Sequence, residues 1–453
     1  MILHYSLFPF HFSLPSPPHH SPQPTPVFRP PFTFAADQPT PTTMRSFVAL
    51  FALVFSPTAF ATDRIVEEFG QAPAYASITA AVAAAVDGDR IIVKNRAGNI
   101  PWIENITVNA SLQFLSFTND DYFYVQGTYT ITGAAGREVT IISMRNTAGG
   151  VGFATGGAVR GTKVRILDSY FVNGILALNN NNFDVDVVGC TLANGSVSIN
   201  YGNVVGCDIN ASAIADEGIS INGNASGFPL DTCAIIGNKV ISPVSYEGIY
   251  SNTQSQVLHI RNNFIQHGWM GIEVYEGNEA GVPNLIWNNT VLAYTGQFTT
   301  YGINMANTNP GSVWEVMNNA VTATWSGTNR GINKDSGNQG QINVYYNNVS
   351  SNLSIPVSPD FTFVSNNTTS EGIELNGDGT FANAPACIDG GNPAPVLSDL
   401  DLTLGDAGAY GGSYTLTNFH PLHTGAARVY LTGHPFNVRS GATLRVKGVA
   451  FDR

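Results

Sequence analysis

The chain of 453 residues has little charge and little cysteine. Only 11% of its residues are charged, against an ordinary value of about 25%. Its four cysteines, Cys190, Cys207, Cys233 and Cys387, form no C-x-x-C pair and no metal-ligand spacing, which argues against a zinc site. The net charge of −12 argues against nucleic acid or an anionic membrane as partner, because both need clustered Lys and Arg.

Long hydrophobic runs are also lacking. The apolar run over residues 47–55 is too short to cross the ~30 Å of a bilayer core, which disfavours a membrane anchor. It follows Met44 and precedes a small-x-small triplet that ends at Ala61, the layout of a secretory signal peptide. We therefore predict a signal peptide over 44–61, and a disordered, Pro-rich extension over 1–43 that reflects a mis-assigned start. The protein is then secreted or lies on a bacterial cell surface.

The chain is rich in glycine instead, and one glycine motif repeats. From about residue 165, a glycine followed by isoleucine opens a short strand at intervals of 23 to 41 residues. Such a period predicts a solenoid of stacked strands. Strand side chains alternate, so each isoleucine is expected in the core and the residue after it on the outer face. The copies are Gly218-Ile219, Gly248-Ile249, Gly271-Ile272, Gly302-Ile303, Gly331-Ile332 and Gly372-Ile373.

A second repeat ends apolar strands in asparagine. Asparagine tolerates left-handed backbone, which suits the sharp corner between strands of a coil. Stacked from rung to rung, its amide can also donate and accept along the solenoid axis. The alternative, that these asparagines bind sugar, stays open. The repeat ends at Asn238, Asn262-Asn263, Asn288-Asn289, Asn318-Asn319, Asn347-Asn348 and Asn366-Asn367.

Two cysteines occur in matching contexts. Cys190 and Cys207 each follow Val-Val-Gly, so we expect them on adjacent rungs, roughly 4.8 Å apart. Their Cβ vectors would be parallel, which suits a disulfide badly. Two buried, unbridged thiols are therefore predicted.

The two ends of the repeat region carry a family resemblance. Residues 77–85 predict a short capping helix with Ser77 as its N-cap. The pattern Ser-Ile-x-x-Ala-Val-x-x-Ala over 77–93, with Gly-Asp and a strand after it, resembles the opening of the pectin-lyase-like, right-handed parallel β-helix superfamily. Residues 388–393 and 405–412 resemble the closing segment of bacterial exported β-helix proteins.

This resemblance implies an all-β fold, a right-handed parallel β-helix over 62–412 that is capped by the helix. It also implies a polysaccharide or cell-surface glycan as partner. Fold does not settle function, and no catalytic motif of the superfamily matches. Residues 413–453 are predicted as a small β extension, either a cap on the last rung or the start of a truncated β-sandwich.

One part of the outer face is rich in groups that recognise sugars. Stacking brings residues of successive glycine–isoleucine strands into one contiguous strip. Rings can stack on sugars, carboxylates can serve as acid and base, and cations can balance uronate charge. We predict Glu273, Arg330 and Asp335 as catalytic residues. The predicted substrate-binding residues are Tyr250, Trp269, Tyr275, Asn304, Asn333 and Lys334. The alternative, ordinary solvated rung positions, stays open.

Three function classes remain from the sequence. They are a polysaccharide lyase or hydrolase, a non-catalytic glycan-binding adhesin, and a structural spacer, and whether the chain is an enzyme is left open. No metal-binding residue is assigned. Calcium is the cofactor that the acidic stretch Asp399, Asp401 and Asp406 could bind, although a capping turn is the favoured interpretation of that stretch. A monomer is expected.

Overall fold

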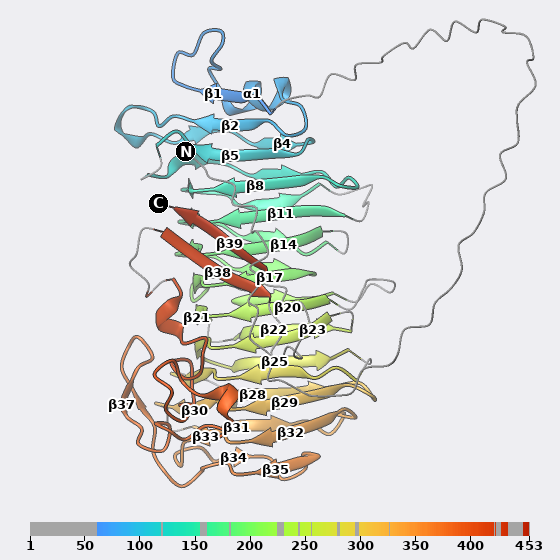
Figure 1. Ribbon diagram of the computed structural model, residues 1–453, viewed down its shortest axis with the longest axis vertical. Helices are drawn as coiled ribbons and strands as arrows, with labels where there is room; N and C mark the ends of the chain where they lie inside the picture. The colour runs from blue at the N-terminus through green and yellow to red at the C-terminus, as the bar shows by residue number, and fades with distance from the viewer. Residues whose placement is uncertain are drawn as a thin grey trace, which may run out of the picture. The chain divides into compact units, whose positions relative to one another are not determined.

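The protein is described by a computed structural model that places residues 61–118, 121–154, 161–180, 183–223, 231–242, 245–254, 256–278, 281–294, 299–325, 327–420, 422, 427–433 and 447–452. The predicted extension and the predicted signal peptide as far as residue 60 lie outside these ranges. The strands stack rung upon rung along the solenoid and form three parallel sheets, A, B and C (Figure 1). The predicted all-β solenoid is confirmed, and its right-handed sense stays a prediction.

Each complete rung contributes one strand to sheet A, then one to sheet B, then one to sheet C, and sheet A has one further strand at each end. Sheet A consists of β1 (Asp63–Val66), β2 (Arg90–Val93), β5 (Leu112–Ser116), β8 (Glu138–Ile142), β11 (Thr162–Leu167), β14 (Phe183–Val188), β17 (Gly202–Val205), β20 (Asp231–Ile236), β23 (Gln256–Arg261), β26 (Asn284–Trp287), β29 (Val313–Met317), β32 (Gln341–Tyr345) and β35 (Phe363–Ser365).

Sheet B consists of β3 (Trp102–Ile103), β6 (Phe123–Gln126), β9 (Met144–Asn146), β12 (Tyr170–Phe171), β15 (Thr191–Leu192), β18 (Asp208–Asn210), β21 (Lys239–Ile241), β24 (Phe264–His267), β27 (Thr290–Ala293), β30 (Ala320–Ala323) and β33 (Asn348–Val349). Sheet C consists of β4 (Ile106–Val108), β7 (Tyr129–Ile131), β10 (Val151–Phe153), β13 (Leu176–Leu178), β16 (Val197–Ile199), β19 (Ile219–Ile221), β22 (Glu247–Thr253), β25 (Met270–Glu276), β28 (Thr300–Asn307), β31 (Asn329–Lys334) and β34 (Ile355–Val357).

The first rung is capped by the predicted helix, α1 (Ile78–Ala84). The Ser77 hydroxyl accepts a hydrogen bond from the Ala80 N–H at 3.1 Å, as an N-cap does. The Glu104 carboxylate accepts the N–H groups of Ile78 and Thr79, where the helix dipole favours negative charge. Within the described ranges no helix is long and apolar enough to cross a membrane. A 3₁₀ turn, η1 (Ala97–Asn99), follows β2.

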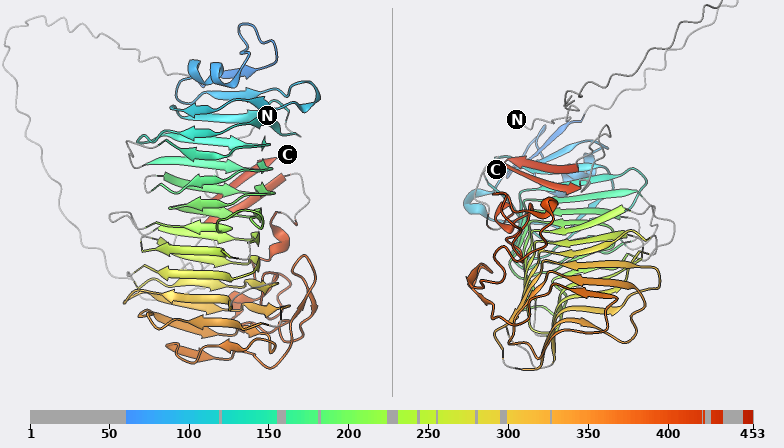
Figure 2. Two further views of the ribbon diagram at one scale, coloured as in Figure 1. Left: turned by 180° about the vertical axis from the view of Figure 1, so that it is seen from behind. Right: turned by 60° about the horizontal axis from the view of Figure 1, so that its bottom comes forward.

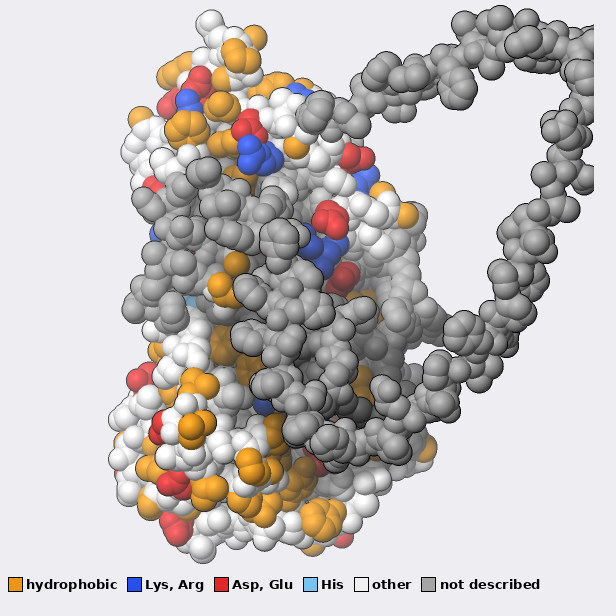
Figure 3. All heavy atoms as spheres, in the orientation of Figure 1, with side chains coloured by type: hydrophobic (Ala, Val, Ile, Leu, Met, Phe, Trp, Pro, Cys, Tyr) orange, Lys and Arg blue, Asp and Glu red, His pale blue; other side chains and the backbone are white. Residues whose placement is uncertain are grey.

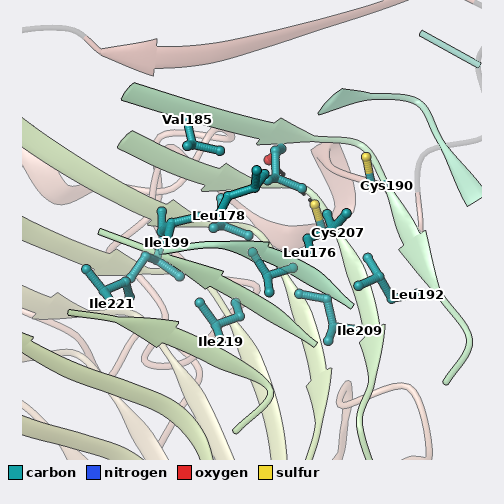
Figure 4. Packing of buried hydrophobic residues seen from close by; sticks show 14 of the residues in the cluster. Leu176, Leu178, Val185, Cys190, Leu192, Ile199, Cys207, Ile209, Ile219 and Ile221 are labelled. Carbon is teal, nitrogen blue, oxygen red and sulfur yellow. Dashed lines mark hydrogen bonds between the residues drawn. The ribbon is translucent and has the colours of Figure 1, made fainter. Parts of the chain in front are cut away.

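The inward side chains of the three sheets form one continuous apolar core. Figure 4 shows part of it, where Leu176, Ile199 and Ile219 come from neighbouring rungs of sheet C. Burial of Ile272 and Ile303 is complete, as the alternation predicted. At the N-terminal end, acidic and basic side chains lie side by side on the outer face (Figure 3), and Arg90 pairs with Asp63 across β1 and β2.

The glycine of the repeat is needed because the chain passes close to sheet B at that point. A Cβ on Gly271 would lie 2.3 Å from Val291 Cγ1, and a Cβ on Gly302 would lie 2.3 Å from Val321 Cγ1. Both valines point into the core from sheet B. Any side chain larger than hydrogen would therefore overlap the interior packing.

The sixth copy of the glycine motif departs from the pattern. Gly372 and Ile373 do not form a rung of sheet C; they precede β36 (Glu374–Leu375), which pairs in antiparallel fashion with β37 (Phe381–Asn383). A Cβ on Gly372 would meet nothing within 4 Å. The prediction that this copy is a solenoid strand is therefore wrong.

A ladder of asparagine amides runs along the corner between sheets A and B. Each Nδ2 donates to a backbone carbonyl on the preceding rung, and each except that of the last member, Asn367, also donates to the Oδ1 of the asparagine on the next rung. Asn263 Nδ2, for example, lies 2.9 Å from Asn289 Oδ1 and 2.9 Å from the Ile235 carbonyl. The members are Asn238, Asn263, Asn289, Asn319, Asn347 and Asn367, and the amide contacts between them are 2.9–3.0 Å. The predicted ladder is confirmed.

The two matched cysteines occupy the same corner on the preceding rungs. The Cys207 N–H donates to Asn238 Oδ1, the contact that an asparagine makes at every later rung. The thiols of Cys190 and Cys207 point to the carbonyls of Ile166 and Val187, in place of the amide donor. Both are buried and unbridged, as predicted (Figure 4).

After the last rung the chain turns back along the solenoid and covers sheet B (Figure 2). Two asparagines that directly precede a ladder asparagine in the sequence bind this segment. Asn262 Nδ2 donates to the Gly411 carbonyl at 2.7 Å, and Asn288 Nδ2 donates to the Asp406 carbonyl at 3.0 Å. The segment includes the 3₁₀ turns η2 (Pro395–Leu397) and η3 (Leu416–Asn418).

Two strands form within the predicted C-terminal β extension. β38 (Ala427–Gly433) pairs in antiparallel fashion with β39 (Lys447–Asp452), and β38 lies beside β17 and β20. Residues 434–446, which connect the two strands, lie outside the described ranges.

The two kinds of glycine give a matched test of the packing. We expect Gly302→Ala to lower the free energy of unfolding by about 1–3 kcal/mol, because overpacking strains the core. Gly372→Ala is expected to change it by less than about 0.5 kcal/mol, since its Cβ meets only open space. Urea denaturation midpoints measure both. Equal loss in the two variants would contradict the close approach to sheet B.

Candidate functional site

The outer face of sheet C carries two parallel columns of side chains in its middle rungs. The pre-glycine column holds the residue before each repeat glycine. It runs from rung to rung through Glu217, Glu247, Met270, Tyr301 and Arg330. The central column holds the residue two places after the glycine, and it consists of Ser220, Tyr250, Glu273, Asn304 and Asn333.

An amide network joins the central column to Asp335. Asn304 Nδ2 donates to Glu273 Oε1 at 3.0 Å and to Asp335 Oδ2 at 3.4 Å. Asn333 Nδ2 donates to Asn304 Oδ1 at 2.8 Å and to Asp335 Oδ1 at 2.9 Å. Two carboxyl groups are thereby held on either side of one amide nitrogen. A network in which each polar group has its partner fixes the geometry of its members.

These outward positions are not ordinary solvated rung positions. Glu273 is 4% exposed, and Asn304 and Asn333 are each 1% exposed. The sequence left open whether the strip is solvated, and these three members of it are buried. Tyr250 and Tyr275, whose ring centroids lie 5.8 Å apart, flank Glu273 on β22 and β25 and are half-buried.

Three glutamates of the two columns share a raised pKa. Burial, followed by the proximity of other carboxyl groups, raises the pKa of Glu247 to about 8 and that of Glu217 to about 7. Burial also raises the pKa of Glu273, and the charge of Asp335 adds to this rise. Close carboxyl groups with raised pKa values are frequent at functional sites, although structural networks show them too.

A hollow of about 580 Å³ lies at Met270 and Tyr301 of the pre-glycine column. It is lined by Ser245, Trp269, Met270, Thr299 and Tyr301, so its wall is mainly apolar and aromatic. Met270 joins the hollow to the network, because its sulfur lies 3.7 Å from Asn304 Nδ2. A ring-lined hollow beside polar groups is the kind of surface that binds a sugar ring.

The two predicted cations bind protein groups. Arg330 Nη1 donates to Asn333 Oδ1 at 2.9 Å, and its guanidinium lies over the Tyr301 ring at 5.6 Å. Lys334 Nζ donates to the Asp360 carbonyl at 2.6 Å. The structure thus places Arg330 at the edge of the network and turns Lys334 away toward the next loop.

The structure brings part of the predicted strip together, and the roles of its residues stay predictions. Glu273, Asp335, Asn304 and Asn333 meet in one network, whereas Trp269 belongs to the neighbouring hollow. The sequence did not indicate the residues Glu217, Ser245, Met270, Thr299 and Tyr301. The available signal was their position, since three of them stand before a repeat glycine.

In the acidic stretch near the C-terminus, the carboxylates accept hydrogen bonds from backbone N–H groups. The Asp399 carboxylate accepts the Asp406 N–H at 3.1 Å and also accepts the Gly412 N–H. The Asp406 carboxylate accepts the Asp389 N–H at 2.7 Å. These bonds agree with the predicted capping turn. Among the described residues no group of three acidic, His or Cys side chains could hold a metal ion.

No protein-family model and no curated protein matches the sequence. Among solved structures, the chain is similar to the Dettilon tailspike protein (gp208), with 14% sequence identity and a TM-score of 0.26. The match covers 64% of this chain and 64% of the tailspike chain. A likeness this distant assigns no activity. What the fold and the face define is a parallel β-solenoid with a candidate site of buried carboxyl and amide groups beside half-buried rings.

The raised pKa of Glu247 predicts how stability depends on pH. An unfolded glutamate titrates near pH 4.3, so between about pH 4.3 and 8 the folded state binds a proton that the unfolded state has lost. The bound proton therefore contributes to the free energy of unfolding fully below this window, and the contribution is lost as pH rises through it. We expect Glu247→Gln to reduce the fall in the thermal midpoint between pH 5 and pH 8 by about 2 °C or more.

The control for this measurement is Glu371→Gln, which changes an exposed carboxyl group away from sheet C. Its midpoint should follow the parent at every pH. If the Glu247 variant also follows the parent, the three glutamates do not share the buried environment described above.

Proposed function

We propose that the protein binds a polysaccharide along the outer face of sheet C and cleaves it by acid–base hydrolysis. The observation that carries the proposal is that Glu273 and Asp335 accept hydrogen bonds from the same amide nitrogen of Asn304. Glycoside hydrolysis generally uses two carboxyl groups that flank the scissile bond.

The spacing of this pair favours one of the two known geometries. The bonded oxygens lie 3.0 and 3.4 Å from the shared nitrogen. These two bonds allow the ~5–5.5 Å that separates the carboxyl groups of retaining enzymes, whereas inverting enzymes need ~6.5–9.5 Å. We therefore propose the retaining geometry.

The environments of the two groups support distinct roles. Burial raises the pKa of Glu273 and favours its protonated form, so it is the candidate general acid that protonates the glycosidic oxygen. Asp335, held by the Asn304 and Asn333 amides, would attack the anomeric carbon. Glu273, then ionised, would take a proton from the water that releases the sugar.

The surrounding rings would bind the polysaccharide. Trp269 and Tyr301 line the hollow, Tyr250 precedes Glu273 in the central column, and the ring of Tyr275 on β25 lies 5.8 Å from that of Tyr250. Sugar rings stack on such aromatic faces. The signal peptide predicted over 44–61 would bring this site to a polysaccharide or surface glycan outside a bacterial cell.

A second candidate is a non-catalytic glycan-binding adhesin. It is favoured by the burial of Glu273, of which only 4% is exposed, because a general acid must reach the glycosidic oxygen. In this case Glu273 would position the outer residues, and the rings alone would contact the glycan.

The test is a panel of neutral, amino and uronic polysaccharides, with and without calcium, in which reducing ends and unsaturated products are followed. We expect new reducing ends with no unsaturated product. Glu273→Gln and Asp335→Asn should each lower turnover by about 10²-fold or more, because each removes an acid or a nucleophile from the reaction.

Glu374→Gln, an exposed carboxyl group on β36, is the matched control and should turn over as the parent does. Unsaturated product would contradict hydrolysis and indicate a lyase. Binding without cleavage would support the adhesin, and the absence of binding to the whole panel would overturn both candidates.

A further inference from the structure

A cluster of tyrosine rings and one guanidinium group lies on the outer face of sheet B, near the N-terminal end of the solenoid. Tyr124 on β6, Arg145 on β9 and Tyr170 on β12 are register partners on successive strands. The guanidinium carbon of Arg145 lies over both rings, 5.7 Å from the Tyr124 centroid and 4.6 Å from the Tyr170 centroid. The ring of Tyr122 meets that of Tyr170 edge-on at 6.4 Å. We call these four side chains the tyrosine-arginine stack.

The charge of Arg145 has no acidic partner in the described part of the chain. Arg90 pairs with a carboxylate at 2.6 Å and Arg165 pairs with one at 3.3 Å. Among the residues that the structure describes, none forms an ion pair with the Arg145 guanidinium or accepts a hydrogen bond from it. The carboxylate of Asp121, beside the stack in sequence, accepts a hydrogen bond from Asn95 Nδ2 at 3.1 Å instead.

Contact with two rings leaves the N–H groups of Arg145 available to a ligand. A guanidinium carries five N–H donors in its own plane, whereas an aromatic ring contacts its face. Arg145, Tyr124 and Tyr170 are half-buried, so solvent reaches all three side chains. The planar fork of donors matches the oxygens of a carboxylate or a sulfate, which it can bind through two parallel hydrogen bonds.

The stack borders the part of sheet B that the returning segment contacts. Tyr170 and Thr191 are register partners on β12 and β15. The Thr191 hydroxyl shares a hydrogen bond of 2.8 Å with His420 Nε2 of the returning segment. The described part of that segment therefore contacts this column one rung beyond the stack, and the half-buried side chains of the stack stay accessible.

We propose that the tyrosine-arginine stack is a second glycan subsite, which binds the acidic group of a charged sugar. The Arg145 guanidinium pairs with the carboxylate or sulfate, and the sugar ring packs on a neighbouring tyrosine. The proposal goes beyond the proposed function and does not rest on it. The sheet C strand of the Arg145 rung, β10, is five rungs away from β25, which carries Glu273, or ~24 Å at ~4.8 Å per rung.

A charged sugar suits the stack better than a protein partner or a neutral sugar. A sugar has an apolar face that packs on rings and hydroxyl groups that a tyrosine hydroxyl can meet. A protein partner favours an apolar centre, whereas the column of the stack continues into the polar residues Thr191 and Asp208. A neutral sugar supplies no charge to pair with Arg145.

The experiment compares acidic polysaccharides with neutral polymers of the same backbone. Polygalacturonate, alginate and hyaluronan are each paired with their carboxyl-reduced form, and dextran sulfate is paired with dextran. Biolayer interferometry of the full chain at about 0.15 M salt, where long-range attraction is screened, measures their dissociation constants. We expect the acidic form of at least one pair to bind about tenfold or more tightly, because it adds a charge-assisted bidentate contact. The carboxylate and sulfate pairs distinguish the two sources of the acidic group.

Three variants locate the contact. Arg145→Gln should reduce the preference for the acidic form to within about twofold and leave binding of the neutral form unchanged. Arg145→Lys keeps a cation beside the rings but loses the planar fork, so it should reduce the preference by about threefold. Arg165→Gln removes the same charge on the next rung, from an arginine that already pairs with Glu138, and should bind as the parent does.

Thermal midpoints show that each variant folds, and Arg145→Lys carries the test if Arg145→Gln does not fold. Equal binding of the two forms in all four pairs overturns the inference. An acidic preference that stays unchanged in the Arg145 variants overturns it too. The proposed function is judged separately, by turnover in the Glu273 and Asp335 variants. Retained preference for an acidic polymer in Glu273→Gln supports a subsite that is separate from sheet C.

Discussion

The asparagine ladder is the interaction on which the rest of the molecule depends. The ladder amides from Asn238 to Asn347 are buried, and each bonds to the rung before and the rung after it, so the loss of one leaves several buried groups without partners. Because each amide meets the equivalent atom of the next rung at 2.9–3.0 Å, the ladder keeps successive corners in register. Fixed corners keep the strands of sheet C in register too, and the columns of the candidate site follow from this alignment.

The same corners also determine which faces of the solenoid the C-terminal segment covers. The residue before a ladder asparagine has a left-handed backbone, at φ 51° in Asn262 and 52° in Asn288, so its side chain points outward. There it binds the returning C-terminal segment, which packs on sheet B and on the end of sheet A. Arg261 is enclosed in that contact between the rings of Trp287 and Tyr414. The bonds that hold this segment use sheets A and B, and the candidate site uses the outer face of sheet C.

Much of the scaffold could be predicted because it obeys local rules. The burial of Ile272 and Ile303 follows from alternation, and the asparagine corners follow from the tolerance of asparagine for left-handed backbone. At the rung of Tyr346 the tyrosine takes the left-handed position, so Asn347, the first asparagine of its pair, joins the ladder. A dipeptide motif does not reveal that shift.

The candidate site was predicted less well, because it depends on contacts between rungs. Glu273 was placed on the correct face, but its burial comes from Asn304 and other side chains that are distant in sequence. The role of the pre-glycine column, with Glu217 and Tyr301, also became visible only in the register of sheet C. The return of the C-terminal segment joins Asn262 to Gly411, residues that are 149 apart in sequence. No local pattern encodes such a contact.

The central claim is that sheet C carries the glycan site, and the structure of a complex tests it most directly. The Glu273→Gln variant, crystallised with the tightest-binding fragment from the polysaccharide panel, should show one sugar ring in the hollow beside Trp269. The chain of sugars should extend along the pre-glycine column, with the scissile bond near Asp335. A fragment bound elsewhere, for instance on the returning segment near Asp399, with sheet C empty, would contradict the account.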